Sequence, residues 1–258
     1  MDNDNYYGAL RAQKSLLLLL KEFHRLCIEK GIQYSLAYGS LLGAIRHNGF
    51  IPWDDDLDIF VQREYYNQLI ECIVNDKVLS LEDNSSISLW IDKVVFRDQL
   101  LNSESAFVPR LDIFVLDRVP SNPIVRVFKK YLILLLQGMM KSKLSWKKGS
   151  IIHKLCALFS YLLGLFIPMR WRQVWYRKAS QLGNNSSDLL LANYNGEYAD
   201  IDRHYPSDMM SSFLEHTFED TKIKIMADYD CCLKLQYGDY MVPPAENQRM
   251  PRHGGKQL

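Results

Sequence analysis

The chain has 258 residues, of which 48% are hydrophobic and 24% are charged, which is typical of a globular protein with one large domain or a domain and a subdomain. A formal net charge of +1 gives no electrostatic reason to expect a nucleic acid or an acidic partner. The five cysteines have no C-x-x-C spacing, which argues against a disulfide framework or a zinc ribbon and favours free thiols.

The first 120 residues alternate between helical and strand patterns. The polar, acidic start lacks the features of a signal peptide, so we expect a cytoplasmic protein. Apolar residues at helical spacing then predict a helix over residues 10–30 that ends at Gly31. The remaining patterns predict helices and strands in mixture, as an α+β fold requires. The expected elements are a strand at 32–37, a helix at 40–46, a turn at Asn48-Gly49, a strand at 57–61, a helix at 64–79 and strands at 87–96 and 111–116.

The composition changes in residues 124–180, which are apolar and basic, and no Asp or Glu occurs between Val119 and Ser187. The two apolar blocks, 131–140 and 155–169, are shorter than the ~20 residues that a membrane-spanning helix needs. One interpretation is a helical subdomain packed on the core. The other is a helical hairpin that lies on an anionic membrane, with peripheral contact through residues 124–170 at the inner face of the cell membrane.

Residues 181–258 return to a mixed composition. They predict a short strand, a helix from about Asp228 to Tyr237 that ends at Gly238, and a loose polar tail over 245–258. We therefore expect a catalytic core at 1–120, a helical insertion at 121–180 and a C-terminal part at 181–258 that completes the catalytic domain.

Four aspartates within five positions, Asp54, Asp55, Asp56 and Asp58, lie directly before an apolar run. Because side chains alternate faces in extended chain, Asp54, Asp56 and Asp58 should share one face, and Asp55 should turn toward the core. Such a row of carboxylates suits Mg²⁺ or Mn²⁺. An EF-hand is excluded because Ile59 and Tyr65 stand where that loop needs Gly and Glu.

Gly39-Ser40 precedes this row, between a predicted strand and a predicted helix. A glycine there lets a ligand approach the backbone, and the helix N-terminus favours phosphate. Gly43 leaves room for close packing or for a ligand. Two-metal phosphoryl transfer usually needs a third carboxylate from another strand. We choose Asp112, a lone carboxylate inside the apolar run "LDIFVLD", and expect Asp117 at the strand end to be a surface or turn residue.

The stretch "YGSLLGAIRHNGFIPWDDDLDIFV" resembles the signature of the LicD family, which also includes fukutin and fukutin-related protein, within the DNA polymerase beta-like nucleotidyltransferase superfamily. The blocks "LDIFVLD" and "FEDTKIKIMADYDCCLKLQYGDYMVPP" are similar to later family blocks, although Ser40 replaces the commoner Thr and Met226-Ala227 replace the usual Pro. The resemblance covers roughly residues 10–117 and 210–253. It implies a nucleotidyltransferase-like mixed sheet flanked by helices, with a helical insertion.

The resemblance also implies the activity: transfer of a phospho-alcohol from a CDP-activated donor to a sugar hydroxyl. Phosphocholine from CDP-choline is the commonest case, on lipopolysaccharide, teichoic acid or capsule, and CDP-ribitol serves the fukutin-type relatives. In this reading Asp56, Asp58 and Asp112 are catalytic, Asp54 assists them in holding Mg²⁺ or Mn²⁺, and no nucleic acid is a partner. The donor phosphates would contact Gly39, Ser40, Gly43, Arg46 and Lys93.

The sequence leaves the roles of several other residues open. Arg46 and His47 could reach a phosphate, or Arg46 could pair with an Asp. Lys93 and Arg97 could touch the donor or simply face solvent, and Trp53 is expected to pack rather than to stack on a base. A nucleotidyltransferase acting on a small acceptor, and an inactive nucleotide- or metal-binding module, are the competing functions.

Overall fold

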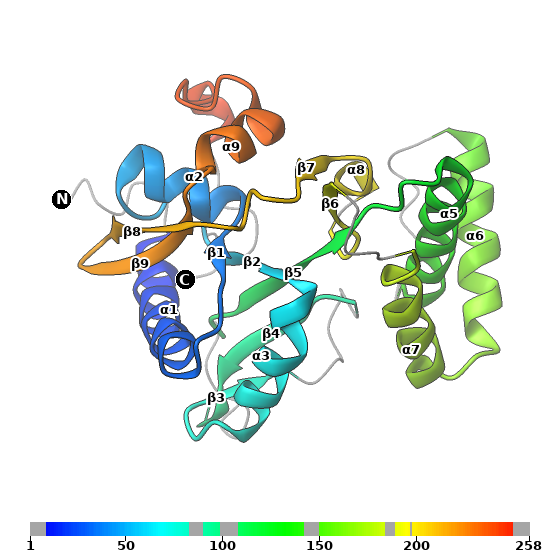
Figure 1. Cartoon of the computed structure of the whole chain (residues 1–258), viewed down its shortest axis with the longest axis horizontal. Coiled ribbons are helices and arrows are strands. Elements are labelled where there is room, and N and C mark those ends of the chain that lie inside the picture. Colours follow the sequence, from blue (N-terminus) through cyan, green and yellow to red (C-terminus); the bar gives the residue numbers. More distant parts are fainter. Residues whose placement is uncertain are drawn as a thin grey trace. The chain divides into compact units, whose positions relative to one another are not determined.

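The computed structural model describes residues 9–82, 90–98, 108–141, 150–183, 189–196 and 198–249. Contacts divide the chain into two compact units (Figure 1). The first unit comprises residues 1–82, 93–115 and 208–258, and the second comprises residues 83–92 and 116–207. Helices and strands occur in both, so the expected α+β class is confirmed.

Helix α1 (Leu10–Lys30) forms as the sequence predicts. Its buried stripe supplies much of the core of the first unit, and Gly31 ends it with a left-handed backbone (φ 66°). The amide of Ile32 still donates to the carbonyl of Cys27, so the chain closes the helix end before it can extend. Strand β1 (Ser35–Leu36) is therefore much shorter than the predicted strand at 32–37.

Helix α2 (Tyr38–His47), strand β2 (Asp58–Gln62) and helix α3 (Arg63–Asn75) follow. The prediction that α3 continues to residue 79 is wrong. Asp76 accepts from the amides of Val78 and Leu79, and this turn redirects the chain into strand β3 (Leu79–Leu81).

The sheet of the first unit has the order β1-β2-β5-β4-β3, with β4 at Asp92–Phe96 and β5 at Leu111–Arg118. β1 pairs antiparallel to β2 with Ser35 opposite Phe60, and β3 pairs antiparallel to β4 with Leu79 opposite Phe96. The part of the expected strand 87–96 at residues 87–89 lies outside the described residues. This order places β2 and β5, which carry Asp58 and Asp112, side by side.

A hairpin of β8 (Phe213–Phe218) and β9 (Thr221–Met226) completes the first unit, followed by α9 (Tyr229–Tyr237) and a short 3₁₀ helix, η2 (Glu246–Gln248). The predicted helix at 228–237 and its end at Gly238 are confirmed. The hairpin contacts α1 and α2, and α9 contacts α2. The sequence did not predict β8, and residues 250–258, with His253, lie outside the described part.

The second unit is built on three helices, α5 (Pro123–Met140), α6 (Ile151–Leu165) and α7 (Met169–Ser180). Helix α5 packs against both others (Figure 1). Strand β6 (Leu190–Asn193) pairs with the last residues of β5 and with β7 (His204–Pro206), and α8 (Tyr198–Ile201) lies between them in the chain. The shared core is formed by Val119, Ile133, Leu136, Met139, Met140, Tyr176, Ala179, Ala192, Tyr194 and Ile201.

The predicted insertion at 121–180 is only a part of the second unit, because β6 pairs with the end of β5 and β7 pairs with β6. Neither β6 nor β7 was predicted from the sequence. Within the described residues, no helix is both long enough and apolar enough to cross a membrane.

Candidate functional site

The aspartate row leads directly into β2. Burial alternates along it, as the face alternation predicted: Asp55, Leu57 and Ile59 are buried, whereas Asp54, Asp56 and Asp58 are half-buried. Only Asp58 belongs to β2 itself, and the residues before it are extended chain without strand pairing. The row therefore presents three carboxylates on the side that does not face the core.

Gly39, in the first turn of α2, lies beside the carboxylates of Asp54 and Asp56. A Cβ atom added to it would lie 2.5 Å from Oδ2 of Asp54 and 4.0 Å from Oδ1 of Asp56. Any larger residue would thus collide with the carboxylate row. The helix N-terminus, with its amide groups and positive dipole end, faces the same place.

Tyr38 turns the chain into α2 with an unusual left-handed backbone (φ 44°). Its ring packs tilted against Phe60 of β2, with centroids 5.0 Å apart, and edge-on against Phe114 of β5, at 4.9 Å. Both partners are buried core residues. Strained backbone of this kind persists where packing fixes it and is frequent at functional sites.

Asp112 of β5 lies beside the aspartate row. Its amide donates to the carbonyl of Leu57 at 2.8 Å, which aligns it with the start of β2. Both of its carboxylate oxygens accept from Nζ of Lys93, at 2.7 and 2.9 Å, and the two side chains are only 21% and 16% exposed. A lone Asp in an apolar strand needs a partner. In this structure the partner is Lys93 on the neighbouring strand β4. The sequence left open whether Lys93 contacts the donor or faces solvent, and the structure adds this pairing with Asp112 as a third role.

Electrostatic repulsion is concentrated at Asp58. Burial raises the pKa of its carboxyl group well above the usual range, and the nearby charges of Asp56, Asp112 and Asp54 raise it further, against a lowering by Lys93. A carboxyl group in this position gains stability from a proton or from a cation. The carboxylate oxygens are the donor type that Mg²⁺ and Mn²⁺ prefer, so the residues fit such an ion by their chemistry.

The carboxylates do not form a finished metal cage. Among the described residues, no group of three or more His, Cys, Asp or Glu side chains is already arranged to hold a metal ion. Lys93 occupies both oxygens of Asp112. The assignment of Asp54, Asp56, Asp58 and Asp112 as metal ligands therefore stays a prediction.

Ser40 and Gly43 have clear packing roles in α2. The Ser40 hydroxyl is buried and accepts from the amide of Asp58 at 2.9 Å, which ties the helix start to β2. A Cβ on Gly43 would lie 2.5 Å from the carbonyl oxygen of Gly49, so this glycine permits the close backbone approach that the sequence offered as one alternative. Contact of either residue with a donor phosphate stays a prediction.

Arg46 braces the first unit, but not through an Asp. Its guanidinium donates to the carbonyl of Tyr240 at 2.9 Å and to Nε2 of His47 at 3.0 Å. Burial lowers the pKa of His47, and the charge of Arg46 lowers it further. Trp53 contacts the edge of the His47 ring, and the guanidinium of Arg249 lies 5.2 Å from the Trp53 ring centroid, so Trp53 packs as expected.

Two residues that the sequence analysis missed hold the loop before the aspartates. Nε2 of Gln13 on α1 donates to the carbonyls of Ile51 (3.0 Å) and Asp54 (2.8 Å). Glu219, in the β8–β9 turn with φ 54°, accepts from the amide of Phe50 at 2.9 Å and donates its own amide to the carbonyl of Asn48 at 2.7 Å. A lone Gln on a helix and a Glu in a distant turn carry no local signal of these contacts.

One expectation near the site needs correction, and a further side chain has a role that the sequence did not indicate. Asp117 is not a surface residue: it is 2% exposed within β5 and is paired opposite Ala192, because the strand continues past Leu116 to Arg118. Arg97 is half-buried and has a packing role, so its contact with the donor stays a prediction. Its guanidinium donates to the carbonyls of Val74, Asp76 and Leu79 and so closes the end of α3.

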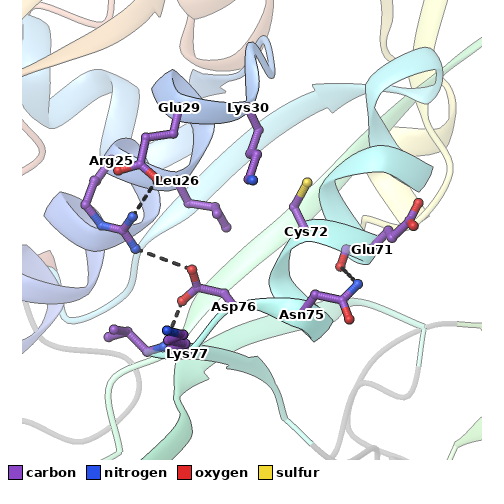
Figure 2. Close-up of a pocket in the computed structure, with 10 residues that line it drawn as sticks. Arg25, Leu26, Glu29, Lys30, Glu71, Cys72, Asn75, Asp76 and Lys77 are labelled. Carbon is purple, nitrogen blue, oxygen red and sulfur yellow. Dashed lines mark hydrogen bonds and ion pairs between the residues drawn. The ribbon is translucent and has the colours of Figure 1, made fainter.

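A surface pocket of about 560 Å³ lies elsewhere in the first unit, between α1 and α3 (Figure 2). Arg25 pairs there with Glu29 at 2.8 Å and with Asp76 at 3.4 Å. The lining of the pocket also includes Lys30 and Cys72. None of the predicted site residues lines it, so it is distinct from the aspartate cluster.

Comparison with known proteins shows where this arrangement belongs. Residues 31–122 match the family model described as "LicD/FKTN/FKRP, nucleotidyltransferase domain". Over these residues the chain is similar to that family domain. The matched residues contain every predicted site residue, from Gly39 to Asp112.

Individual relatives extend the similarity. The chain is 29% identical to "Lipopolysaccharide cholinephosphotransferase LicD" of Haemophilus influenzae over 263 aligned positions, which cover 95% of this chain and 96% of the relative. It is also 50% identical over 50 residues to an uncharacterized protein of Rickettsia prowazekii and to one of Rickettsia typhi, and these matches cover less than a fifth of each chain. The LicD likeness thus extends through the second unit as well as the first.

Proposed function

We propose that this protein transfers phosphocholine from CDP-choline to a sugar hydroxyl of a bacterial surface glycan, with lipopolysaccharide as the first candidate, and releases CMP. The observation that carries this proposal is the near full-length likeness to a lipopolysaccharide cholinephosphotransferase. The carboxylate cluster around Gly39 supports it, because phosphoryl transfer depends on positioning and on charge stabilisation rather than on covalent catalysis.

The donor diphosphate fits the N-terminal end of α2. Gly39 lies there without a side chain of its own, beside the carboxylate of Asp54, and a phosphate at a helix N-terminus gains from the amide groups and the dipole. Lys93 is the cation closest to Asp112, and its flexible ammonium group can turn from that carboxylate to a phosphate oxygen. Movement of Lys93 onto the donor would then free Asp112.

Asp56 and Asp58 would hold Mg²⁺, with Asp112 and Asp54 completing the ligand set. When bound, the ion neutralises phosphate charge and lowers the pKa of a coordinated hydroxyl group. This assignment accounts for the repulsion at Asp58, which the neighbouring carboxylates cause and a divalent cation would relieve.

In the transfer step, the acceptor oxygen forms a bond to the phosphorus that bears choline, and the bond from that phosphorus to the bridging oxygen breaks. CMP leaves with the bonding electrons. Asp112, once free of Lys93, takes the hydroxyl proton. Asp54, Asp56 and Asp58 keep their places through the contacts of Gln13, Ser40 and Glu219 with the loop and β2.

The decisive experiment incubates purified protein with CDP-choline, CDP-ribitol and CDP-glycerol and follows CMP release with Mg²⁺ and with EDTA, in the presence of a lipopolysaccharide or teichoic acid acceptor. CDP-choline should be the best donor, and EDTA should abolish the reaction. Asp56→Asn and Asp58→Asn should lose CMP release at unchanged fold. Near-normal CMP release by a folded Asp58→Asn protein would falsify the assignment.

A nucleotidyltransferase is the competing function that the same aspartates allow. Cytidine-labelled donor separates the two, because the label leaves as CMP in our proposal and stays on the acceptor in nucleotidyl transfer. Donor binding without turnover of any of the three donors would instead favour an inactive nucleotide-binding module.

A further inference from the structure

Helix α6 is strongly apolar for a helix of 15 residues at the surface of its unit, and its polar residues are His153, Lys154, Ser160 and Tyr161. Its outer side carries a stripe of large apolar residues at spacings of three and four, and this stripe continues to the residue after the helix. Folded proteins rarely leave so many large apolar side chains exposed together on one face. They are Ile151 (76%), Leu155 (58%), Phe159 (64%), Leu162 (46%) and Phe166 (85%).

The opposite side of α6 is fixed against α5 by small residues. A Cβ on Gly138 of α5 would lie 2.5 Å from Cβ of Ser160, and a Cβ on Gly164 would lie 2.2 Å from the carbonyl oxygen of Met139. Ser160 and Gly164 are buried in this contact. Because the two helices meet so closely along these residues, α6 cannot rotate to bury its apolar stripe within the second unit.

The sequence that forms α5, α6 and α7 carries charges of one sign. Between Val119 and Ser187 the sequence holds twelve Lys and Arg residues and no Asp or Glu. Lys154 lies on α6 itself, and Lys141 is exposed directly after the end of α5. At the other end of α6, the exposed Arg170 lies beside the half-exposed Trp171, with its guanidinium 5.9 Å from that ring.

We propose that the apolar stripe of α6 docks on the surface of an anionic lipid bilayer, with the helix lying in the plane of the interface. A stripe of aliphatic and phenyl side chains buries into the acyl boundary, and the surrounding cations contact anionic headgroups. The tryptophans of α7, Trp171 and Trp175, are of the type that prefers the interface. Fifteen residues rise about 22 Å, too short to span the hydrocarbon core.

This choice of partner follows from charge. A second copy of the chain would bring the same excess of cations to the interface, and the two would repel each other. An anionic bilayer supplies the opposite charge along with an apolar interior. The inference does not depend on the proposed transfer reaction, since it rests on α5, α6 and α7 and on none of the predicted site residues.

Flotation with vesicles tests the proposal on the full-length protein. We expect the wild type to float with phosphatidylcholine vesicles that contain 30% phosphatidylglycerol at 50 mM salt, and the floating fraction to fall severalfold at 500 mM salt or with pure phosphatidylcholine. Phe159→Glu and Phe159→Ser should each reduce the floating fraction, the Glu variant about tenfold or more. Leu18→Glu changes a residue of α1 that is equally exposed (59%) and should float like the wild type.

The opposite results are equally clear. A wild type that stays in the dense fraction with phosphatidylglycerol vesicles at low salt overturns the proposal, and so does equal flotation with neutral vesicles. Loss of flotation in Leu18→Glu as large as in Phe159→Glu would show that the effect is not specific to α6. A dimer in light scattering that Phe159→Glu converts to a monomer, without vesicle binding, would assign the stripe to self-association. Release of CMP from a soluble donor should be equal in wild type and Phe159→Glu, so failure of the transferase proposal is detected separately.

Discussion

Replacement of Gly39 by alanine should separate activity from stability. The added methyl group would lie 2.5 Å from Oδ2 of Asp54, and the nearest backbone is not among the atoms it meets. Since a carboxylate at the end of a side chain can rotate away, the fold can absorb the change. The Asp54 carboxylate, however, must then shift by about an ångström.

The magnitudes follow from this geometry. Alanine in place of a helical glycine gains up to about 1 kcal/mol of helix propensity, which offsets the local crowding. We therefore expect the free energy of unfolding of Gly39→Ala to stay within about 1 kcal/mol of the wild type. A displacement of about 1 Å in a reacting group costs on the order of 100-fold in rate, so CMP release from CDP-choline should fall by about that factor.

Gly43→Ala is the matched control, on the same helix one turn later. Its methyl group would lie 2.5 Å from the carbonyl oxygen of Gly49 and 3.1 Å from the amide nitrogen of Ile51, both backbone atoms. We expect a loss of about 1–3 kcal/mol of stability from this overpacking. Thermal melting and CMP release are measured on both variants. Full activity in Gly39→Ala, or equal destabilisation of the two variants, would refute the reasoning.

Three further predictions concern charge. Asp58→Asn removes the group on which repulsion is concentrated, so it should raise the melting temperature in EDTA, by about 2–4 °C for each kcal/mol relieved, and abolish transfer; an unchanged or lower melting temperature would count against the repulsion. Lys93→Met leaves Asp112 without its partner and should cost about 2 kcal/mol in urea unfolding, part of which Asp112→Asn should restore in the double variant. Burial and the charge of Lys224 lower the pKa of His24, whose Nδ1 lies 2.8 Å from the Tyr34 hydroxyl. The unfolded state therefore binds more protons, and wild-type stability should fall as pH drops below about 6.5, more steeply than in His24→Gln.

The helices of the first unit could be predicted because their signals are local. The apolar spacing of α1 and the left-handed Gly31 mark both its body and its end. A boundary that depends on a distant residue is predicted wrongly. Helix α3 ends at Asn75, where Asp76 accepts from the amides of Val78 and Leu79. Arg97, more than twenty residues later, donates to the carbonyls of Val74 and Asp76, and no spacing rule contains that contact.

The strands of the second unit show the same limit. Strands β6 and β7 have four and three residues, too few for a clear alternation. Strand β6 forms because the end of β5 offers it an edge to pair with, and β7 pairs in turn with β6. That pairing also buries Asp117, which the sequence placed at the surface. Burial of a polar strand residue follows from its neighbours in the sheet, which the sequence does not reveal by pattern.

In the site, the sequence identified the carboxylates but not what holds them. The alternation of Asp54, Asp55, Asp56 and Asp58 is a local property and holds in the structure. The proximity of Asp112 to this row was a choice among carboxylates, and its contact with Leu57 supports that choice. The pairing of Lys93 with Asp112 needs the order of strands β5 and β4, which pattern alone does not provide.

The pairing of Lys93 with Asp112 also reduces the electrostatic repulsion among the carboxylates of the site. Carboxylates gathered at one place destabilise a protein unless something neutralises them. Lys93 neutralises Asp112, yet burial and the neighbouring carboxylates still raise the pKa of Asp58 well above its usual range. Natural sequences retain such local conflicts chiefly where function requires them. The unrelieved repulsion is therefore the physical reason to expect a cation at Asp58, and Lys93 is the residue that must move if Asp112 is to join it.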